Sequence, residues 1–446
     1  MDQVTSSGLP RGGALGALSH PLPSGMRDLL PQEAEEQLRL SRQVLRTFEL
    51  HGFQQVVLPV FEYADVLEQG LGHIEPNSVL RFVEPETGEV VALRPDMTPQ
   101  VARLVATRLK DEPGPLRLSY SGSVLRRRHE RARHHQQVVQ AGIELVGRGG
   151  PDGDLEVLRA ATDAVRSAGL QDFVLDLGHG RIAGELLADV PAEARQELLE
   201  SLTLKDGAEL VRRAEAARLP RALVSALSAL LELSGGESVF REAKKTLGDT
   251  AAWPLVLEVE RLFRAAEVAQ LAPDMVVDLG ETRSFQYYTG PLFQVLAEGP
   301  GQAVGAGGRY DSLFGRFGAE RPAAGFAVQI DNLRWALGAA MPENPEPRVL
   351  VVTGAENGAV EATLAALRAA KIACAVGPDE SPLDYARSWR YSHVAWLTAP
   401  ERARLTRVTS LGRAAPTGEA AGDQGLSEVS LGEVELRQLS SKILAG

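Results

Sequence analysis

The chain contains 446 residues, of which 44% are hydrophobic and 24% charged, and its formal net charge at pH 7 is −12. This composition is typical of a globular protein with two or three domains, and the acidity argues against a broad nucleic-acid-binding surface. The single cysteine, Cys374, excludes an internal disulfide and a multi-cysteine metal site. The common metal and phosphate-loop motifs, a signal peptide and a long apolar run are also absent. We therefore expect a cytoplasmic protein with no cofactor, no metal and no membrane partner.

The first predicted elements are a tail, a helix and a strand. Residues 1–23 are rich in glycine, proline and serine, and we expect them to be disordered. A periodic apolar pattern predicts a helix from Pro31 to about Leu50. The run "FQQVVLPVFEY", residues 53–63, predicts one strand with a proline near its end.

The next segment, "EVVALRPDMTPQVARLVATRLK", predicts a strand, a turn and a helix. Thr98 is the expected N-cap of this helix and Pro99 its first residue, because threonine caps helices well and proline fits their first turn. After it, the alternating runs at 116–128 and 136–147 predict an antiparallel pair of strands joined by a loop at 129–135.

Helical patterns with one strand, at 173–178, fill the region from about 155 to 270. Strands separated by glycine turns follow, and "AAGFAVQIDNLRWALGAA" predicts the end of a strand entering a helix. Prolines mark a linker at 341–347. Beyond it, residues 348–446 alternate strand and helix, which predicts a small α/β domain with a parallel sheet. Within that domain, residues 410–430 have the composition of a flexible insertion.

Gln140 and Glu144 are the first candidates for a binding site. They lie on the same face of one predicted strand, since side chains alternate between its faces. Gly142 lies between them and leaves room for a ligand across the sheet. A buried carboxylate is costly unless it is paired. The structural alternative is therefore that Glu144 is paired with a nearby arginine.

Further candidates lie in two other motifs. "LRPDMTP" supplies Asp96 beside a helix N-terminus, with a helix cap or an ion pair to Arg94 as the structural alternative. "TRSFQYYTG" supplies Arg283, Tyr287 and Tyr288. If this segment is a strand, the two tyrosines face opposite sides, so that one belongs to the core and the other to a pocket.

These groups together suit a free amino acid with a polar side chain. The carboxylates would hold its ammonium group, while tyrosine and glutamine would hydrogen-bond to the two nitrogens of an imidazole. Arg283 would bind a carboxylate or a phosphate.

The segment 126–135 contains five arginines and three histidines. Three interpretations stay open for it: an anion-binding or partner-binding segment, a solvated loop, and a nucleic-acid contact.

Several motifs resemble, in the same order, the catalytic core of the class II histidyl-tRNA synthetases. They are "GMRDLLP" (25–31), "LRPDMT" (93–98), "VLRRRHERARHHQQVVQAGIELVG" (124–147), "RSFQYYTGPLFQV" (283–295), "GAGGRYDSLFGRFG" (305–318) and "AAGFAVQIDNLRWAL" (323–337). The resemblance implies an α+β fold whose core, residues 24–340, is an antiparallel sheet flanked by helices, with a helical insertion at about 181–271.

The resemblance also shows where this sequence departs from the ATP site of the synthetases. In motif 2 the expected arginine is present as Arg126, but Leu125 replaces a phenylalanine and Arg128 replaces a glutamate. The arginine of the motif 2 loop is replaced by His134. A carboxylate that contacts adenine and the amino acid has thus become a cation.

Motif 3 departs further, because Gln329, Asp331 and Asn332 stand where the family has glycine, glutamate and arginine. Asparagine cannot form the bidentate, charge-assisted pair of arginine with phosphate. Arg334 lies two positions later and would point about 200° away on a helix. Losing one such donor typically costs about 10²–10³ in rate, so we expect negligible formation of an adenylate.

The amino-acid site is better kept, and the resemblance assigns candidate roles to its residues. The candidate histidine-binding residues are Asp96, Thr98, Gln140, Glu144, Arg283, Tyr287 and Tyr288, and the candidate anion-binding residues are Arg126 and Arg128. Ser284, Phe285 and Gln286 depart from the family pattern beside them.

A histidine site next to a damaged ATP site resembles the regulatory-subunit family of the short-form ATP phosphoribosyltransferases. This resemblance implies a non-catalytic protein that assembles with the short catalytic subunit, forms a dimer and takes L-histidine as effector. It would be required for activity and for histidine feedback in the first step of L-histidine biosynthesis. The alternatives are an active histidyl-tRNA synthetase and a free histidine-sensing or tRNA-binding scaffold.

Residues 348–446 loosely resemble the anticodon-binding domain of the synthetases. They contain eleven lysines and arginines and eleven aspartates and glutamates. Binding to phosphates needs clustered cations, so we expect a degenerate domain and no nucleic-acid partner.

Overall fold

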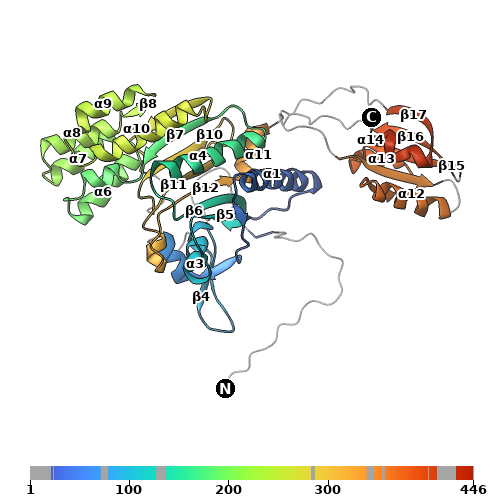
Figure 1. Cartoon of the computed structure of the whole chain (residues 1–446), viewed down its shortest axis with the longest axis horizontal. Coiled ribbons are helices and arrows are strands. Elements are labelled where there is room, and N and C mark those ends of the chain that lie inside the picture. The colour runs from blue at the N-terminus through green and yellow to red at the C-terminus, as the bar shows by residue number, and fades with distance from the viewer. Residues whose placement is uncertain are drawn as a thin grey trace, which may run out of the picture. The chain divides into compact units, whose positions relative to one another are not determined.

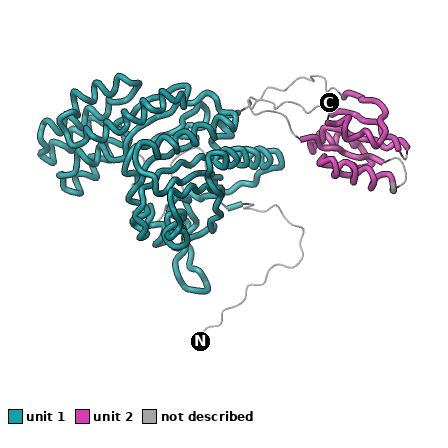
Figure 2. The backbone as a smooth tube through the Cα atoms, viewed as in Figure 1, with its two compact units in different colours: residues 1–338 teal, residues 339–446 magenta. Residues whose placement is uncertain are grey.

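The computed structural model of the chain forms two compact units, residues 1–338 and 339–446 (Figure 2). It describes residues 22–23, 25–71, 79–126, 137–282, 287–338, 346–353, 357–399, 401–408 and 428–444. The expected loop at 129–135 lies outside the described residues, as do most of the expected tail and of the expected linker. Among the helices described, none is long and apolar enough to cross a membrane.

A nine-stranded mixed sheet forms the centre of the first unit, in the order β1-β5-β6-β12-β11-β10-β7-β9-β8 (Figure 1). Its strands are β1 (Gln54–Gln55), β5 (Leu116–Leu125), β6 (Gln137–Val146), β7 (Val174–His179), β8 (Ser234–Gly235), β9 (Asp274–Asp278), β10 (Pro291–Leu296), β11 (Gly305–Arg309) and β12 (Ala323–Gln329). Only the pairs β1–β5 and β7–β9 are parallel among these strands. The expected antiparallel sheet is therefore confirmed for most of its width and corrected at these two pairs.

The predicted pairing of residues 116–125 with 137–146 is confirmed as β5 and β6. In their register Tyr120 lies opposite Gly142, and Leu118 lies opposite Glu144. Tyr120 therefore shares the sheet face of Gln140 and Glu144, because directly opposed residues point to the same side.

Helices pack against the sheet and against one another. They are α1 (Pro31–Leu50), α3 (Thr98–Arg108), α4 (Gly150–Ser167) and α11 (Ile330–Leu337). The predicted helix α1 is confirmed; it begins at a proline and buries Leu40, Val44 and Phe48, which recur every four residues and so lie along one stripe. This stripe contacts α4, and α1 also contacts α11.

The single strand expected at 53–63 is wrong, because this segment forms two short strands in different sheets. β1 belongs to the central sheet, whereas β2 (Phe61–Tyr63) belongs to a three-stranded sheet, β2-β4-β3, with β3 (Arg81–Val83) and β4 (Val90–Leu93). Pro59 lies between them and has no backbone N–H for a strand ladder. Its carbonyl instead accepts hydrogen bonds from Arg94 and Gln100.

The helical region expected between 155 and 270 is also present. After α4 and β7 come α5 (Ile182–Leu186), α6 (Ala192–Thr203), α7 (Gly207–Ala216), α8 (Arg221–Leu230), α9 (Ser238–Leu247) and α10 (Trp253–Val268). α10 contacts α4 and β7, which joins these helices to the edge of the central sheet.

The second unit is a five-stranded sheet, β14-β13-β15-β16-β17, with helices on both faces. Its elements are β13 (Arg348–Thr353), α12 (Asn357–Ala369), β14 (Ala373–Val376), α13 (Pro382–Ser388), β15 (His393–Ala399), β16 (Arg402–Val408), β17 (Glu428–Glu435) and α14 (Leu439–Leu444). The strands β14, β13 and β15 are parallel as expected. The expectation of a wholly parallel sheet is wrong, because β16 and β17 are antiparallel and residues 428–430, assigned to the insertion, begin β17.

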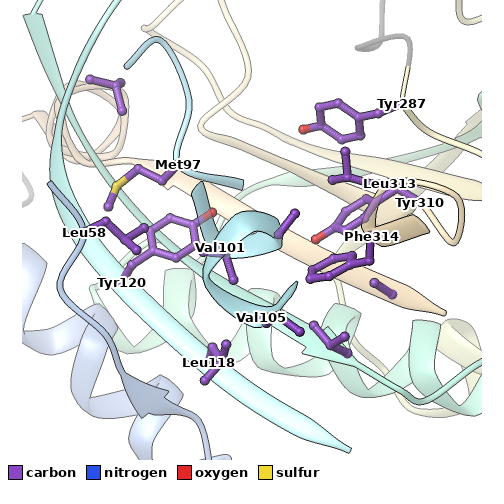
Figure 3. Close-up of a cluster of buried hydrophobic side chains, with 14 residues drawn as sticks. Leu58, Met97, Val101, Val105, Leu118, Tyr120, Tyr287, Tyr310, Leu313 and Phe314 are labelled. Carbon is purple, nitrogen blue, oxygen red and sulfur yellow. The ribbon is translucent and has the colours of Figure 1, made fainter. Parts of the chain in front are cut away.

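A buried cluster joins α3 to the central sheet and includes the rings of Tyr120, Tyr287, Tyr310 and Phe314 (Figure 3). The Tyr120 ring fills the space over Gly142 that the sequence suggested for a ligand. A Cβ on Gly142 would lie 2.5 Å from the Tyr120 hydroxyl oxygen and 2.7 Å from the Phe326 carbonyl oxygen. The glycine therefore makes room for a ring of the protein itself.

This close approach predicts that Gly142→Ala destabilises the fold by about 1–3 kcal/mol, the usual penalty for overpacking a core. The control is Gly184→Ala in α5, where a Cβ would meet no atom within 4 Å. The free energy of unfolding from urea titrations measures both. Equal stability of the two variants would contradict the tight contact with Tyr120.

Candidate functional site

A pocket with about 470 Å³ of empty space opens in the first unit, beside the β4–α3 turn and above β6, β11 and β12. The structure brings six of the predicted residues to its wall: Asp96, Thr98, Arg126, Gln140, Tyr287 and Tyr288. Of the other three, Glu144 lies behind the wall, and Arg283 and Arg128 lie outside the described residues.

Asp96 connects three segments of the site. Its Oδ1 accepts the backbone N–H of Thr98 at 2.9 Å, and its Oδ2 accepts from Arg126 at 3.1 Å and from Gln140 at 3.2 Å. The expected alternative of an ion pair with Arg94 is wrong. Asp96 instead ties the start of α3 to the ends of β5 and β6.

Arg94 is a structural residue, buried below the pocket. Its guanidinium donates to the carbonyls of Leu58 at 3.0 Å, Pro59 at 2.8 Å and Ser123 at 2.9 Å. It lies against Gly122, where a Cβ would collide with it. Carbonyl oxygens therefore satisfy this cation, and it holds the chain before β2 against β5.

Thr98 was expected to cap α3, and the structure corrects this. The helix begins at Thr98 after Met97, and it is Asp96 whose carboxylate accepts the first backbone N–H of the helix, as the helix-cap alternative for Asp96 suggested. The Thr98 hydroxyl instead donates to Glu144 Oε1 at 2.8 Å. Pro99 accordingly lies in the first turn of the helix, where its missing N–H costs nothing.

Glu144 is a fully buried carboxyl, and the expected alternative of an arginine partner is not found within the described residues. Its Oε1 accepts from Thr98 and from the Tyr120 hydroxyl, the latter at 3.1 Å. Burial raises the pKa of Glu144 well above its usual 4.5. The charge of Asp96 adds to this rise, while the hydrogen bonds from Thr98 and Tyr120 oppose it. The pocket therefore lies over a carboxyl that favours its protonated form.

Three buried polar atoms of this region have no hydrogen-bond partner among the described residues: Gln140 Oε1, Glu144 Oε2 and the Tyr310 hydroxyl. Glu144 Oε2 and the Tyr310 hydroxyl approach the same point, where a Cβ on Gly325 would collide with both. Unpaired buried polar atoms are costly. Gln140 belongs to the pocket wall, so a ligand that donates an N–H group to Gln140 Oε1 would remove the cost of that atom.

The tyrosines differ from the expectation that they face opposite sides of a strand. β10 begins only at Pro291, and Tyr287 and Tyr288 precede it with their ring centroids 4.8 Å apart. The Tyr287 ring also meets Tyr310 edge-on, with 5.4 Å between centroids. Both tyrosines therefore line the pocket. Burial raises the pKa of both hydroxyls, so they stay neutral hydrogen-bonding groups.

The start of α11, where the synthetases carry motif 3, is engaged in internal contacts. Asp331 accepts from Arg27 at 2.5 Å and from the backbone N–H of Val139 at 2.9 Å. Asn332 donates to the Ala303 carbonyl at 2.8 Å. The helix therefore fastens the segment before α1 and the start of β6.

Arg334, the nearest arginine to Asn332 in the sequence, points elsewhere as expected from helix geometry. It lies 3.2 Å from Glu33 and 3.5 Å from Glu36, both on α1. Two carboxylates thus hold this cation on the far side of the helix from the motif 3 position.

Sequence reasoning missed two residues of the site, Tyr120 and Tyr310. Tyr120 could have been found from the strand alternation, since it faces the same way as Glu144 with a glycine opposite. Tyr310 follows a glycine-rich run that is a weak signal alone, and only the fold brings it over Gly325.

Comparison with known proteins agrees with this geometry. A sequence model of the histidyl-tRNA synthetase family matches residues 25–333. A solved structure from Bacillus halodurans C, described as an ATP phosphoribosyltransferase regulatory subunit/histidyl-tRNA synthetase, is similar with a TM-score of 0.74 and 28% identity, over 86% of this chain and all of that one. The first unit thus has the core fold of a class II aminoacyl-tRNA synthetase.

Sequence relatives narrow the assignment. A protein of Moorella thermoacetica is 38% identical over 72% of this chain and 83% of its own length. One of Anaeromyxobacter sp. (strain Fw109-5) is 42% identical over 71% of this chain and 92% of its own length. Both are named ATP phosphoribosyltransferase regulatory subunit. The chain belongs to this family, as its motifs indicated.

The raised pKa of Glu144 gives a pH prediction. The folded state keeps a proton on Glu144 that the unfolded chain loses above about pH 4.5, so this residue lowers stability as the pH rises from there towards its folded pKa. Glu144→Gln removes the titration and keeps the shape. The free energy of unfolding of the variant should therefore increase relative to that of the wild type as the pH rises. A difference that stays constant from pH 4 to 8 would show that Glu144 has no such shift.

Proposed function

We propose that the chain is the non-catalytic regulatory subunit of a short-form ATP phosphoribosyltransferase. In this role it is required for the activity of the short catalytic subunit and for feedback inhibition by L-histidine in the first step of L-histidine biosynthesis. The names of the relatives support this role. It also agrees with the cytoplasmic location expected from the sequence.

The residues at the start of α11 are the main support for the proposal that the chain has no catalytic activity. Asp331 and Asn332 occupy the positions at which the synthetases hold glutamate and a phosphate-binding arginine. An asparagine bound to a backbone carbonyl and an aspartate paired with Arg27 supply no cation to a triphosphate. An active histidyl-tRNA synthetase needs that cation, so this alternative is disfavoured.

The proposed effector, L-histidine, matches the groups of the pocket. Asp96 and the unpartnered Gln140 Oε1 are acceptors for an ammonium or an imidazole N–H. Of the proposed anion-binding residues, Arg126 lies in the pocket wall and would bind the carboxylate of the ligand. Arg128 and Arg283 lie outside the described residues, and their anion-binding roles rest on the sequence alone. A zwitterion suits the Asp96–Arg126 pair because it brings one charge of each sign to it.

A proposed dimer face lies on the sheet β2-β4-β3. Its exposed aromatic residues Phe61, Tyr63 and Phe82 lie on one face of the sheet, because Phe61 is opposite Leu93 and both Tyr63 and Phe82 are opposite Val91. The rings of Phe61 and Phe82 meet edge-on with centroids 5.6 Å apart. Apolar side chains gathered in this way mark interaction surfaces, and the synthetase resemblance favours a second copy of the chain.

The second unit lies outside the part of the chain that the family model matches. We propose that residues 348–446 are a degenerate anticodon-binding domain with a structural role. The equal numbers of acidic and basic residues there support a unit that does not bind nucleic acid.

The central prediction concerns phosphoribosyl transfer from phosphoribosyl pyrophosphate to ATP by the short catalytic subunit of the same genome. We expect strong stimulation by this chain, and reversal of that stimulation by L-histidine. Gln140→Leu should keep the stimulation and lose the histidine response, because it removes the acceptor that lines the pocket. Absence of stimulation, together with histidine-dependent ATP–pyrophosphate exchange, would favour the synthetase alternative.

The dimer face is tested by Phe82→Asp, which places a charge on the aromatic face of this sheet. Sedimentation velocity should show a shift from dimer to monomer, because the charge would lose its water in the interface. Leu204→Asp is the control, since Leu204 is exposed directly after α6, in the helical insertion. A dimer that survives in the Phe82 variant would assign self-association to another surface.

A further inference from the structure

A second hollow lies in the helical insertion, between α9 and α10, well separated from β4 in Figure 1. It is an open hollow with about 970 Å³ of empty space, part of it open to solvent. We call it the insertion groove. Its walls are Glu237, Phe240, Arg241 and Lys244 on the α9 side and Trp253, Leu257, Glu260 and Arg264 on α10.

The floor of the insertion groove is apolar. Phe240 is buried in it and meets Phe263 edge-on with 5.5 Å between centroids, which anchors α9 to α10. Trp253 and Leu257 complete the floor on α10, and Leu257 is 36% exposed. The two helices therefore pack through their inner faces and leave aromatic and aliphatic surface open between them.

The rim of the groove carries an excess of positive charge. Arg264 lies 3.2 Å from Glu237 and 2.8 Å from Glu260, so one cation pairs with both rim carboxylates, and the three cations of the rim exceed its two carboxylates by one charge. Arg241 and Lys244 remain, one helical turn apart on α9. Arg241 lies 3.7 Å from Glu242, whose two oxygens both accept from Lys245. Within the described residues, Lys244 makes no ion pair.

We propose that the insertion groove binds an acidic, amphipathic helix of the catalytic subunit; this inference rests on the proposed function. The ten residues of α9 give a wall about 15 Å long at ~1.5 Å per residue, enough for almost three turns of a helix. Apolar side chains of the bound helix would enter between Trp253 and Leu257. Its carboxylates would face Arg241 and Lys244, as in other helix-in-groove complexes.

A second copy of this chain fits the insertion groove less well. In a two-fold symmetric contact the same patch meets itself. Each rim carries a net positive charge, so the two patches would repel one another overall. The apolar dimer face on β2-β4-β3 has no such conflict and lies elsewhere on the unit.

The double variant Arg241→Glu/Lys244→Glu tests the groove. Both side chains are exposed, so the fold should keep its thermal stability, its dimer and its histidine binding. We expect the catalytic subunit to bind at least about tenfold more weakly, since charge pairs at an interface with a matched partner become repulsive. The wild-type affinity should also fall with added salt, and this dependence should be reduced in the variant.

Lys245→Glu is the matched control, because it reverses a charge on the same helix outside the groove. Its ion pair with Glu242 is exposed and worth little, so binding should remain at the wild-type level. Leu257→Asp tests the apolar floor independently and should weaken binding in the same direction as the double variant. Titration calorimetry with the purified catalytic subunit measures all four proteins.

The outcomes separate this inference from the proposed function. If the catalytic subunit binds the wild type and all the variants equally, the groove is not the docking site, although the regulatory role stands. If the double variant alters self-association instead, the occupant is a second copy, and the inference is overturned. If the catalytic subunit neither binds nor is stimulated by the wild type, both the proposed function and this inference fail.

Discussion

The pocket depends on two positions of the central sheet that carry no side chain. Because position 142 is glycine, the Tyr120 ring lies across β6 and its hydroxyl reaches Glu144. Because position 325 is glycine, Glu144 Oε2 and the Tyr310 hydroxyl come to the same point. A buried carboxyl can therefore be held by hydroxyl groups alone. A methyl group at either position would separate the groups that define the site.

The amino-acid side and the nucleotide side of the ancestral site have diverged. On the first side Asp96, Gln140 and the tyrosines still converge on one pocket and leave acceptors unpaired. On the second side Asp331 and Asn332 have become parts of the internal framework. The proposed function assigns recognition of a small zwitterion to the first side, and among the described residues the motif 3 position offers no arginine to a triphosphate. This division is what a regulatory chain derived from a synthetase requires.

The sequence predicted the long elements well and the short ones poorly. The alternation at 116–146 identified β5, β6 and the shared face of Gln140 and Glu144, because a period of two over ten residues has few other readings. Pro59 divided a segment that looked like one strand, and Tyr287 and Tyr288 precede β10. That these residues belong to one binding site was predicted from the resemblance to a family, not from the pattern of the sequence. Their partners, such as Thr98 for Glu144 and Arg126 for Asp96, depend on tertiary packing between segments distant in the chain.

Asp331 has a consequence for the evolutionary history of this chain. It binds Arg27 and accepts the backbone N–H of Val139. On its β12 side Val139 has no strand partner, because the pairing of β6 with β12 ends at Gln140. A change at Asp331 or Asn332 alone would remove an internal contact of this framework. Restoring the synthetase residue at one of these positions would not restore it at the other, so a return to the synthetase sequence has to replace these contacts as well.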